Sequence, residues 1–198
     1  MKLQTPTAWS GVTIQQWMAL RDLADEYKED GNTLTYQIRQ LAIMADIRED
    51  QAREVPLSEY NNLRRRFLFL QVPPDGKAPG KFTIKSNTYR PRLDFDSMTA
   101  SEFIDLTEYS KSPEDNAHEL LALMCDGPGK AHERAEVFLQ CLTMDKAYPL
   151  LVFFYTVWSD FTSNTLLSLT EAMSQRLTSE WSETPPDSDT TPSIGGGS

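Results

Sequence analysis

The two histidines and two cysteines are the side chains that could bind a transition metal or form a nucleophile–base pair. His118 and Cys125 are seven residues apart, and His132 and Cys141 are nine apart. Neighbouring ligands of a structural zinc site are usually separated by only about two to five residues. A cysteine–histidine pair is possible in principle, but buried, unreactive thiols are much more common. We therefore predict no metal, no cofactor and no enzymatic activity.

Two carboxylates and one glycine-rich turn could carry other chemistry. Asp94 and Asp96 flank Phe95 just before a predicted helix. Paired carboxylates can exchange protons with a substrate, but before a helix they are more commonly stabilised by the positive end of its dipole. The segment Gly127-Pro128-Gly129-Lys130 follows a predicted helix, not a strand, and lacks the spacing of a phosphate-binding loop. Nucleotide binding is therefore not expected.

The charges favour a protein partner. The chain has 19 Lys+Arg and 29 Asp+Glu, a formal net charge of −10. Duplex DNA, RNA and anionic membranes need a basic face, so we predict neither nucleic acid nor membrane as a partner. Arg64, Arg65 and Arg66 are the one basic cluster, but three successive residues of a helix fan over about 200°. We interpret them as a solvated face or as members of intramolecular salt bridges.

The sequence predicts a reduced, cytosolic protein. No apolar run follows Lys2, so no secretory signal is expected. The longest apolar stretch, residues 147–157, is well short of the ~20 residues that span a bilayer. Two cysteines do not suggest a secreted disulfide framework.

Apolar periodicity predicts helices in the first third of the chain. Thr13 and Gln16 have the spacing of a capping box, so a helix should run from Thr13 to about Asp30. The further predicted elements are a helix at Thr35–Ala45, a helical turn at Arg48–Val55 and a helix at Pro56–Leu70 with Tyr60, Leu63, Phe67 and Leu70 on one stripe.

A Pro/Gly-rich region then predicts a change of structure. Residues 82–85 and those around Tyr89 alternate apolar and polar side chains, with Ser86-Asn87 as a tight turn between them. A lone hairpin is marginal in water, so it must pack on helices. Helices should resume at a second capping box, Thr99 to Glu102, and then at Ser112, at His132–Leu142 and near Tyr148.

We therefore predict a mainly α (α+β) fold: a bundle of about six to seven helices with one small β-hairpin near residues 81–91 and a disordered C-terminal tail. The predicted organisation is a flexible arm at 1–12, one domain at 13–177 and a disordered tail at 178–198, whose composition cannot bury enough apolar area to fold. The domain divides into helical residues 13–71, a hairpin region at 72–98 and helical residues 99–177.

The last predicted helix, running from near Tyr148 to about Leu177, has more apolar surface than an ordinary helix. One stripe contains Leu150 and Phe154, and a second, offset by one residue, contains Leu151 and Tyr155. A surface helix normally has a single stripe about 100° wide. The helix is either a central core helix or one whose second stripe meets a partner, and both can hold at different turns. The candidate partner-binding residues are Phe153, Trp158, Phe161, Leu166, Leu169 and Met173.

The order of several short segments resembles the tail assembly chaperones of long-tailed bacteriophages, in the broad sense of the lambda gpG-like group. The resembling stretch runs roughly over residues 14–154. Its marks are Ile14-Gln15-Gln16-Trp17, Gln40 to Ala45, Pro56 to Tyr60, Arg66 to Leu70, a hairpin ending in Tyr89, Leu93-Asp94, Met98 to Leu106, His118 to Ala122 and Val152-Phe153-Phe154-Tyr155.

The resemblance implies a non-enzymatic protein that binds the long, helical tape measure protein and keeps it soluble while tail tube subunits polymerise around it. It would act in the host bacterial cytoplasm and be absent from the mature virion. The partners implied are the tape measure protein and tail tube subunits, with self-association also open. The alternative is a virion structural or adaptor protein, such as a baseplate or head–tail connector component.

Overall fold

The computed structural model describes residues 3–29, 33–92, 94, 97–160 and 162. Its contacts divide the chain into two units, Met1–Tyr155 and Thr156–Ser198. Each unit is described by itself below. The predicted boundaries of the arm, the domain and the tail stay predictions.

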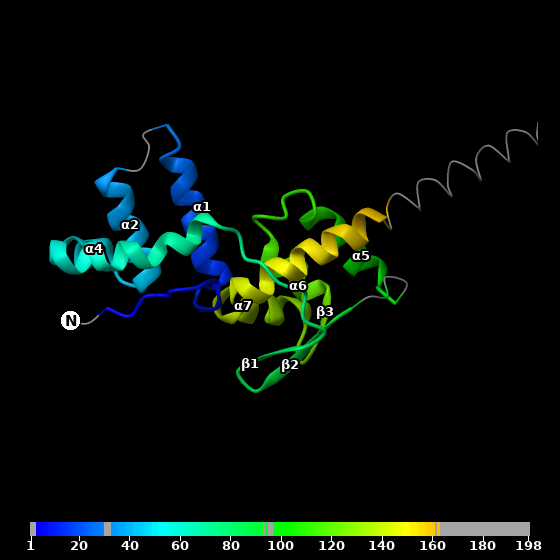
Figure 1. The fold of residues 1–198 in the computed structure, drawn as a ribbon. Coiled ribbons are helices and arrows are strands. Elements are labelled where there is room, and N and C mark those ends of the chain that lie inside the picture. The colour runs from blue at the N-terminus through cyan, green and yellow to red at the C-terminus, as the bar shows by residue number, and fades with distance from the viewer. Residues whose placement is uncertain (1–2, 30–32, 93, 95–96, 161, 163–198) are drawn as a thin grey trace, which may run out of the picture. The chain divides into compact units, whose positions relative to one another are not determined.

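The first part of unit 1 is helical, as predicted (Figure 1). Its elements are the 3-10 helix η1 (Trp9–Gly11), α1 (Ile14–Glu26), α2 (Leu34–Ala45), α3 (Glu49–Arg53), α4 (Leu57–Arg66) and the 3-10 helix η2 (Phe67–Gln71). Thr13 and Gln16 form the predicted capping box, which satisfies two backbone N–H groups at the start of α1. The helix predicted to reach Leu70 ends at Arg66, and its last turn tightens into η2.

The buried faces of these helices follow the predicted apolar spacing. Leu23 of α1 and Leu41 and Met44 of α2 are at most 3% exposed. Tyr60, Leu63 and Phe67 of the predicted stripe are also buried, whereas Leu70, its fourth member, is half-buried in η2. Residues before α1 contribute as well: the Trp9 indole donates to the carbonyl of Val72 at 2.8 Å.

The predicted hairpin is present, but it belongs to a three-stranded antiparallel sheet. Its strands are β1 (Phe82–Ile84), β2 (Asn87–Pro91) and β3 (Cys125–Asp126), in the order β1-β2-β3. The predicted turn at Ser86-Asn87 was wrong by one residue: Ile84 pairs with Asn87, so Lys85 and Ser86 form the turn. Lys85 has φ 53°, the positive φ that two-residue hairpin turns require.

Three helices complete the framework around the sheet. They are α5 (Ala100–Tyr109), α6 (Ala117–Leu123) and α7 (Ala131–Cys141). The predicted capping box of Thr99 and Glu102 is present. The hydrogen bond from the Thr99 backbone lowers the pKa of Glu102, and nearby Arg92 acts in the same direction against the effect of burial. The helix predicted at Ser112 begins at Ala117, because residues 112–116 form turns instead.

An aromatic cluster joins the sheet to α7. The centroid of the Phe138 ring lies 4.9 Å from that of the Tyr89 ring and 5.7 Å from that of the Phe82 ring. Phe138 is 0% exposed and Tyr89 is 1% exposed. Five of the seven residues of α6 are buried as well, and α6 packs against α7 and β3, so the sheet and these helices share one core.

A helix begins at residue 144, four residues earlier than predicted. Two backbone hydrogen bonds explain the earlier start: Ile14 N donates to Leu142 O at 3.1 Å, and Met144 N donates to Val12 O at 2.8 Å. They tie the start of this helix to the start of α1.

The described residues therefore confirm a mainly helical fold with a small antiparallel sheet. Within these residues, no helix is both long enough and apolar enough to cross a membrane.

Candidate partner-binding surface

The helix over residues 144–155 separates the two predicted stripes. Leu150 is 0% exposed and Phe154 is 6% exposed, whereas Val152 and Tyr155 are 51% and 60% exposed. Phe153 and Leu151 are half-buried between these two sides. In unit 1, therefore, the stripe of Leu150 and Phe154 meets the core, whereas of the second stripe Leu151 is half-buried and Tyr155 is exposed. We call Val152, Phe153 and Tyr155 the apolar side of this helix.

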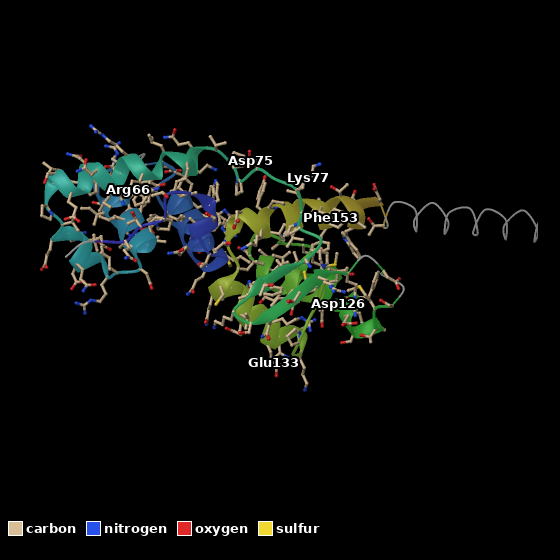
Figure 2. The ribbon with its side chains drawn as sticks, turned by 60° about the horizontal axis from the view of Figure 1, so that its bottom comes forward. Arg66, Asp75, Lys77, Asp126, Glu133 and Phe153 are labelled. Carbon is tan, nitrogen blue, oxygen red and sulfur yellow. The ribbon has the colours of Figure 1, made fainter. Side chains whose placement is uncertain are left out.

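Neighbouring side chains and the segment around Gly76 contact the helix that carries the apolar side. The Phe153 and Phe154 rings contact each other with centroids 5.5 Å apart. Gly76 lies near the Pro149 ring, so the chain after η2 passes the second turn of the helix; Figure 2 labels Asp75 and Lys77 of that segment and Phe153 of the helix. Burial of Leu150 and Phe154 fixes which side of the helix faces outward.

The remaining predicted binding residues belong to unit 2. Trp158 is half-buried, and its backbone carbonyl accepts a hydrogen bond from the Thr162 hydroxyl at 2.9 Å. Phe161, Leu166, Leu169 and Met173 lie outside the described residues. Val152 and Tyr155 are exposed but were not among the predicted binding residues; the sequence interpretation placed Tyr155 on the second stripe and Val152 on neither. The position of Val152 three residues before Tyr155 is the signal that could have identified it.

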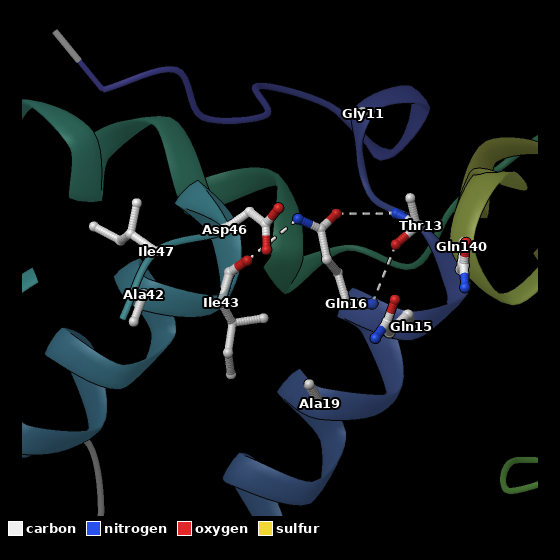
Figure 3. A pocket seen from close by; sticks show the side chains of 10 residues that line it. All are labelled: Gly11, Thr13, Gln15, Gln16, Ala19, Ala42, Ile43, Asp46, Ile47 and Gln140. Carbon is white, nitrogen blue, oxygen red and sulfur yellow. Dashed lines mark hydrogen bonds between the residues drawn. The ribbon is translucent and has the colours of Figure 1, made fainter. Parts of the chain in front are cut away.

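A pocket of about 520 Å³ opens between the start of α1, the end of α2 and α7 (Figure 3). The Gln16 side-chain amide links α1 to α2: Oε1 accepts from the Thr13 backbone at 3.1 Å, and Nε2 donates to Ile43 O at 3.2 Å. The lining has amides, one carboxylate and apolar groups, but no histidine, cysteine or lysine. Its residues are Gly11, Thr13, Gln15, Gln16, Ala19, Ala42, Ile43, Asp46, Ile47 and Gln140.

The side chains considered for metal or nucleophilic chemistry lie in separate environments. Cys125 is buried in β3 and Cys141 is half-buried at the end of α7, and both are free thiols. The Nδ1 atom of His118 lies 2.8 Å from a carboxylate oxygen of Glu119, and His132 is exposed. Across the described ranges, no three His, Cys, Asp or Glu side chains are grouped as metal ligands.

The two carboxylates before α5 are only partly described. Asp94 is exposed, and its backbone carbonyl accepts a hydrogen bond from the Ser97 hydroxyl at 2.8 Å. Asp96 lies outside the described residues. This hydrogen bond closes a turn just before α5, and it involves the backbone of Asp94 and not its carboxylate.

Cys125 should resist thiol reagents in the folded protein. Burial raises the pKa of its thiol to about 12, so at about pH 8 its thiolate fraction is on the order of 10⁻⁴. We expect a chromogenic disulfide reagent to label Cys141 in the native chain and Cys125 only after unfolding in guanidinium. In the variant Cys141→Ser, native labelling should fall to nearly zero, while Cys125→Ser should keep it. Rapid labelling of native Cys141→Ser would contradict this prediction.

Comparisons with known proteins give this chain no relative. No family model matches it, no curated protein matches it, and no solved structure matches it.

Proposed function

We propose that this protein is a non-enzymatic tail assembly chaperone of a long-tailed bacteriophage, which binds the tape measure protein and keeps it soluble during tail assembly. The observation that carries the proposal is the exposed apolar side at Val152 and Tyr155, on a chain of net charge −10. A holding chaperone needs an apolar surface for its client and enough charge to stay in solution. The resemblance in segment order supplies the identity of the client.

The mode of binding follows from the shape of the surface. An exposed apolar side of a helix binds a helical client through side chains spaced three and four residues apart. Because the core residues Leu150 and Phe154 already fix the orientation of the helix, little ordering is needed when the client arrives. Val152 and Tyr155 are too few to bury the ~800 Å² of a standard partner surface. The proposal assigns the rest to Phe153 and to the predicted residues Trp158, Phe161, Leu166, Leu169 and Met173.

The test is co-expression of the chain with the tape measure protein encoded by the same phage. We expect a soluble complex that elutes as one peak in size-exclusion chromatography. The double variant Val152→Gln/Tyr155→Gln should bind about tenfold more weakly, a loss of about 1.4 kcal/mol of binding free energy. Both side chains are mainly exposed, so thermal unfolding should change little.

The matched control is Leu34→Gln on α2. Leu34 is 62% exposed, so the substitution also removes an exposed apolar side chain, but on another element. It should leave client binding unchanged. An insoluble tape measure protein beside the wild-type chain would overturn the proposal, as would equal losses in the two variants. Mass spectrometry of purified particles tests the second candidate, because a virion component would appear there in stoichiometric amounts.

A further inference from the structure

A second exposed surface lies on α4 and η2, away from the residues used above. Leu57, Leu68 and Val72 are 71%, 60% and 63% exposed, so three of the large apolar side chains most open to solvent lie within 16 residues. Arg64, Arg65 and Arg66 are all exposed in the same segment. This combination of cations and apolar groups is unusual on a chain of net charge −10.

Helical spacing places part of this set on one side of α4. Residues four and seven positions after Leu57 return to nearly the same angle on an α-helix, which aligns Leu57 with Asn61 and Arg64. Arg65 lies beside this line and Arg66 on the other side of the helix, and Leu68 follows in η2. We call Leu57, Asn61, Arg64, Arg65 and Leu68 the basic stripe. The opposite side of α4 is buried through Tyr60, Leu63 and Phe67.

The arginines of this segment differ from others in the described ranges. No hydrogen bond or ion pair of the Arg64, Arg65 or Arg66 guanidinium is found among the described residues. Six other described arginines have carboxylate or carbonyl partners, whereas no such partner of the exposed Arg90 is found among the described residues. The six are Arg21, Arg39, Arg48, Arg53, Arg92 and Arg134. Of the two interpretations of the cluster, a solvated face or members of intramolecular salt bridges, the described residues fit the solvated face.

We propose that the basic stripe binds an acidic amphipathic helix of another protein. Arginine forms two parallel hydrogen bonds with a carboxylate, and here no internal pair has to be broken first. Leu57 on α4 and Leu68 on η2 are exposed on either side of the arginines in sequence, and they offer the apolar contacts that an amphipathic helix needs. For its charges to complement these arginines, the partner helix needs glutamate and aspartate next to its apolar residues.

A second copy of this chain fits the stripe poorly. Symmetric pairing of two copies through the basic stripe would bring Arg64 and Arg65 of both copies into one contact. The like charges of the two arginine clusters would repel each other. A single short cluster of arginines is also a weak site for duplex nucleic acid.

The experiment uses a fluorescein-labelled synthetic helix of about 21 residues, with leucine at the apolar repeat and glutamate on both flanks. Fluorescence anisotropy with the full chain should show binding that weakens as sodium chloride is added. The variant Arg64→Gln/Arg65→Gln/Arg66→Gln should bind at least about tenfold more weakly. Its matched control, Lys77→Gln/Lys81→Gln/Lys85→Gln, removes three exposed cations elsewhere and should stay within about twofold of wild type.

Two further variants separate recognition of a helix from attraction of any polyanion. Leu57→Ser/Leu68→Ser should weaken binding several-fold while keeping the charge, and Arg64→Lys/Arg65→Lys/Arg66→Lys should recover part of the affinity lost with glutamine. Equal losses in the two triple glutamine variants would overturn the proposal. Tighter binding of a labelled DNA duplex than of the helix would also overturn it. These outcomes leave the tape measure test unaffected, because that test concerns Val152 and Tyr155.

Discussion

Replacing Phe138 with alanine is expected to lower the free energy of unfolding by about 3–5 kcal/mol. The side chain is 0% exposed, and its ring contacts both Phe82 of β1 and Tyr89 of β2. Removing it leaves a cavity at the point where α7 meets the sheet. Since a domain is typically stable by only about 5–15 kcal/mol, one substitution would remove a large share of that stability.

Urea unfolding followed by circular dichroism measures the effect as a lower midpoint with an unchanged slope. The control is Phe103→Ala on α5, whose side chain is 39% exposed and should cost less than about 1.5 kcal/mol. If Phe138→Ala cost no more than this control, the aromatic cluster would not be the centre of the core. Partial collapse of neighbouring rings into the cavity would place the result near 3 kcal/mol.

Local signals predicted much of this fold. The capping boxes at Thr13 and Thr99 need only residues three positions apart, and both are present. The alternation at residues 82–84 and around Tyr89 likewise predicted β1 and β2, with an error of one residue in the turn. These features depend on backbone hydrogen bonds between near neighbours, which the sequence displays directly.

Distant pairings were not predictable in the same way. β3 has only two residues, and it exists because Cys125 and Asp126 pair with Pro91 and Arg90. The early start of the helix at residue 144 depends on bonds to Val12 and Ile14, about 130 residues away in sequence. A segment of two or three residues is too short to show a periodic pattern, so the sequence could not reveal such contacts.

The candidate surface shows the same division. The two apolar stripes of the last helix were visible in the sequence, but their environments were not. Leu150 and Phe154 are buried because the rest of unit 1 packs on that side, which leaves Tyr155 exposed. The choice between a core stripe and a surface stripe therefore depends on tertiary packing, which the period of a helix does not encode.

Replacing Gly127 with alanine is expected to destabilise the protein by about 2–3 kcal/mol, although residue 127 is itself on the surface. A Cβ atom at this position would lie 2.3 Å from Cδ1 of Tyr89, well inside van der Waals contact. The Tyr89 ring cannot easily give way, because Phe82 and Phe138 contact it. The substitution must therefore shift the backbone after β3 or displace the aromatic cluster.

Gly80→Ala is the matched control, because a Cβ atom there would meet nothing within 4 Å. It should change the free energy of unfolding by less than about 1 kcal/mol. A double-mutant cycle with Tyr89→Leu gives the decisive comparison: with a smaller, flexible side chain beneath it, Gly127→Ala should cost at least about 1 kcal/mol less than in wild type. An equal cost in both backgrounds would assign the effect to the backbone at residue 127 and not to the ring of Tyr89.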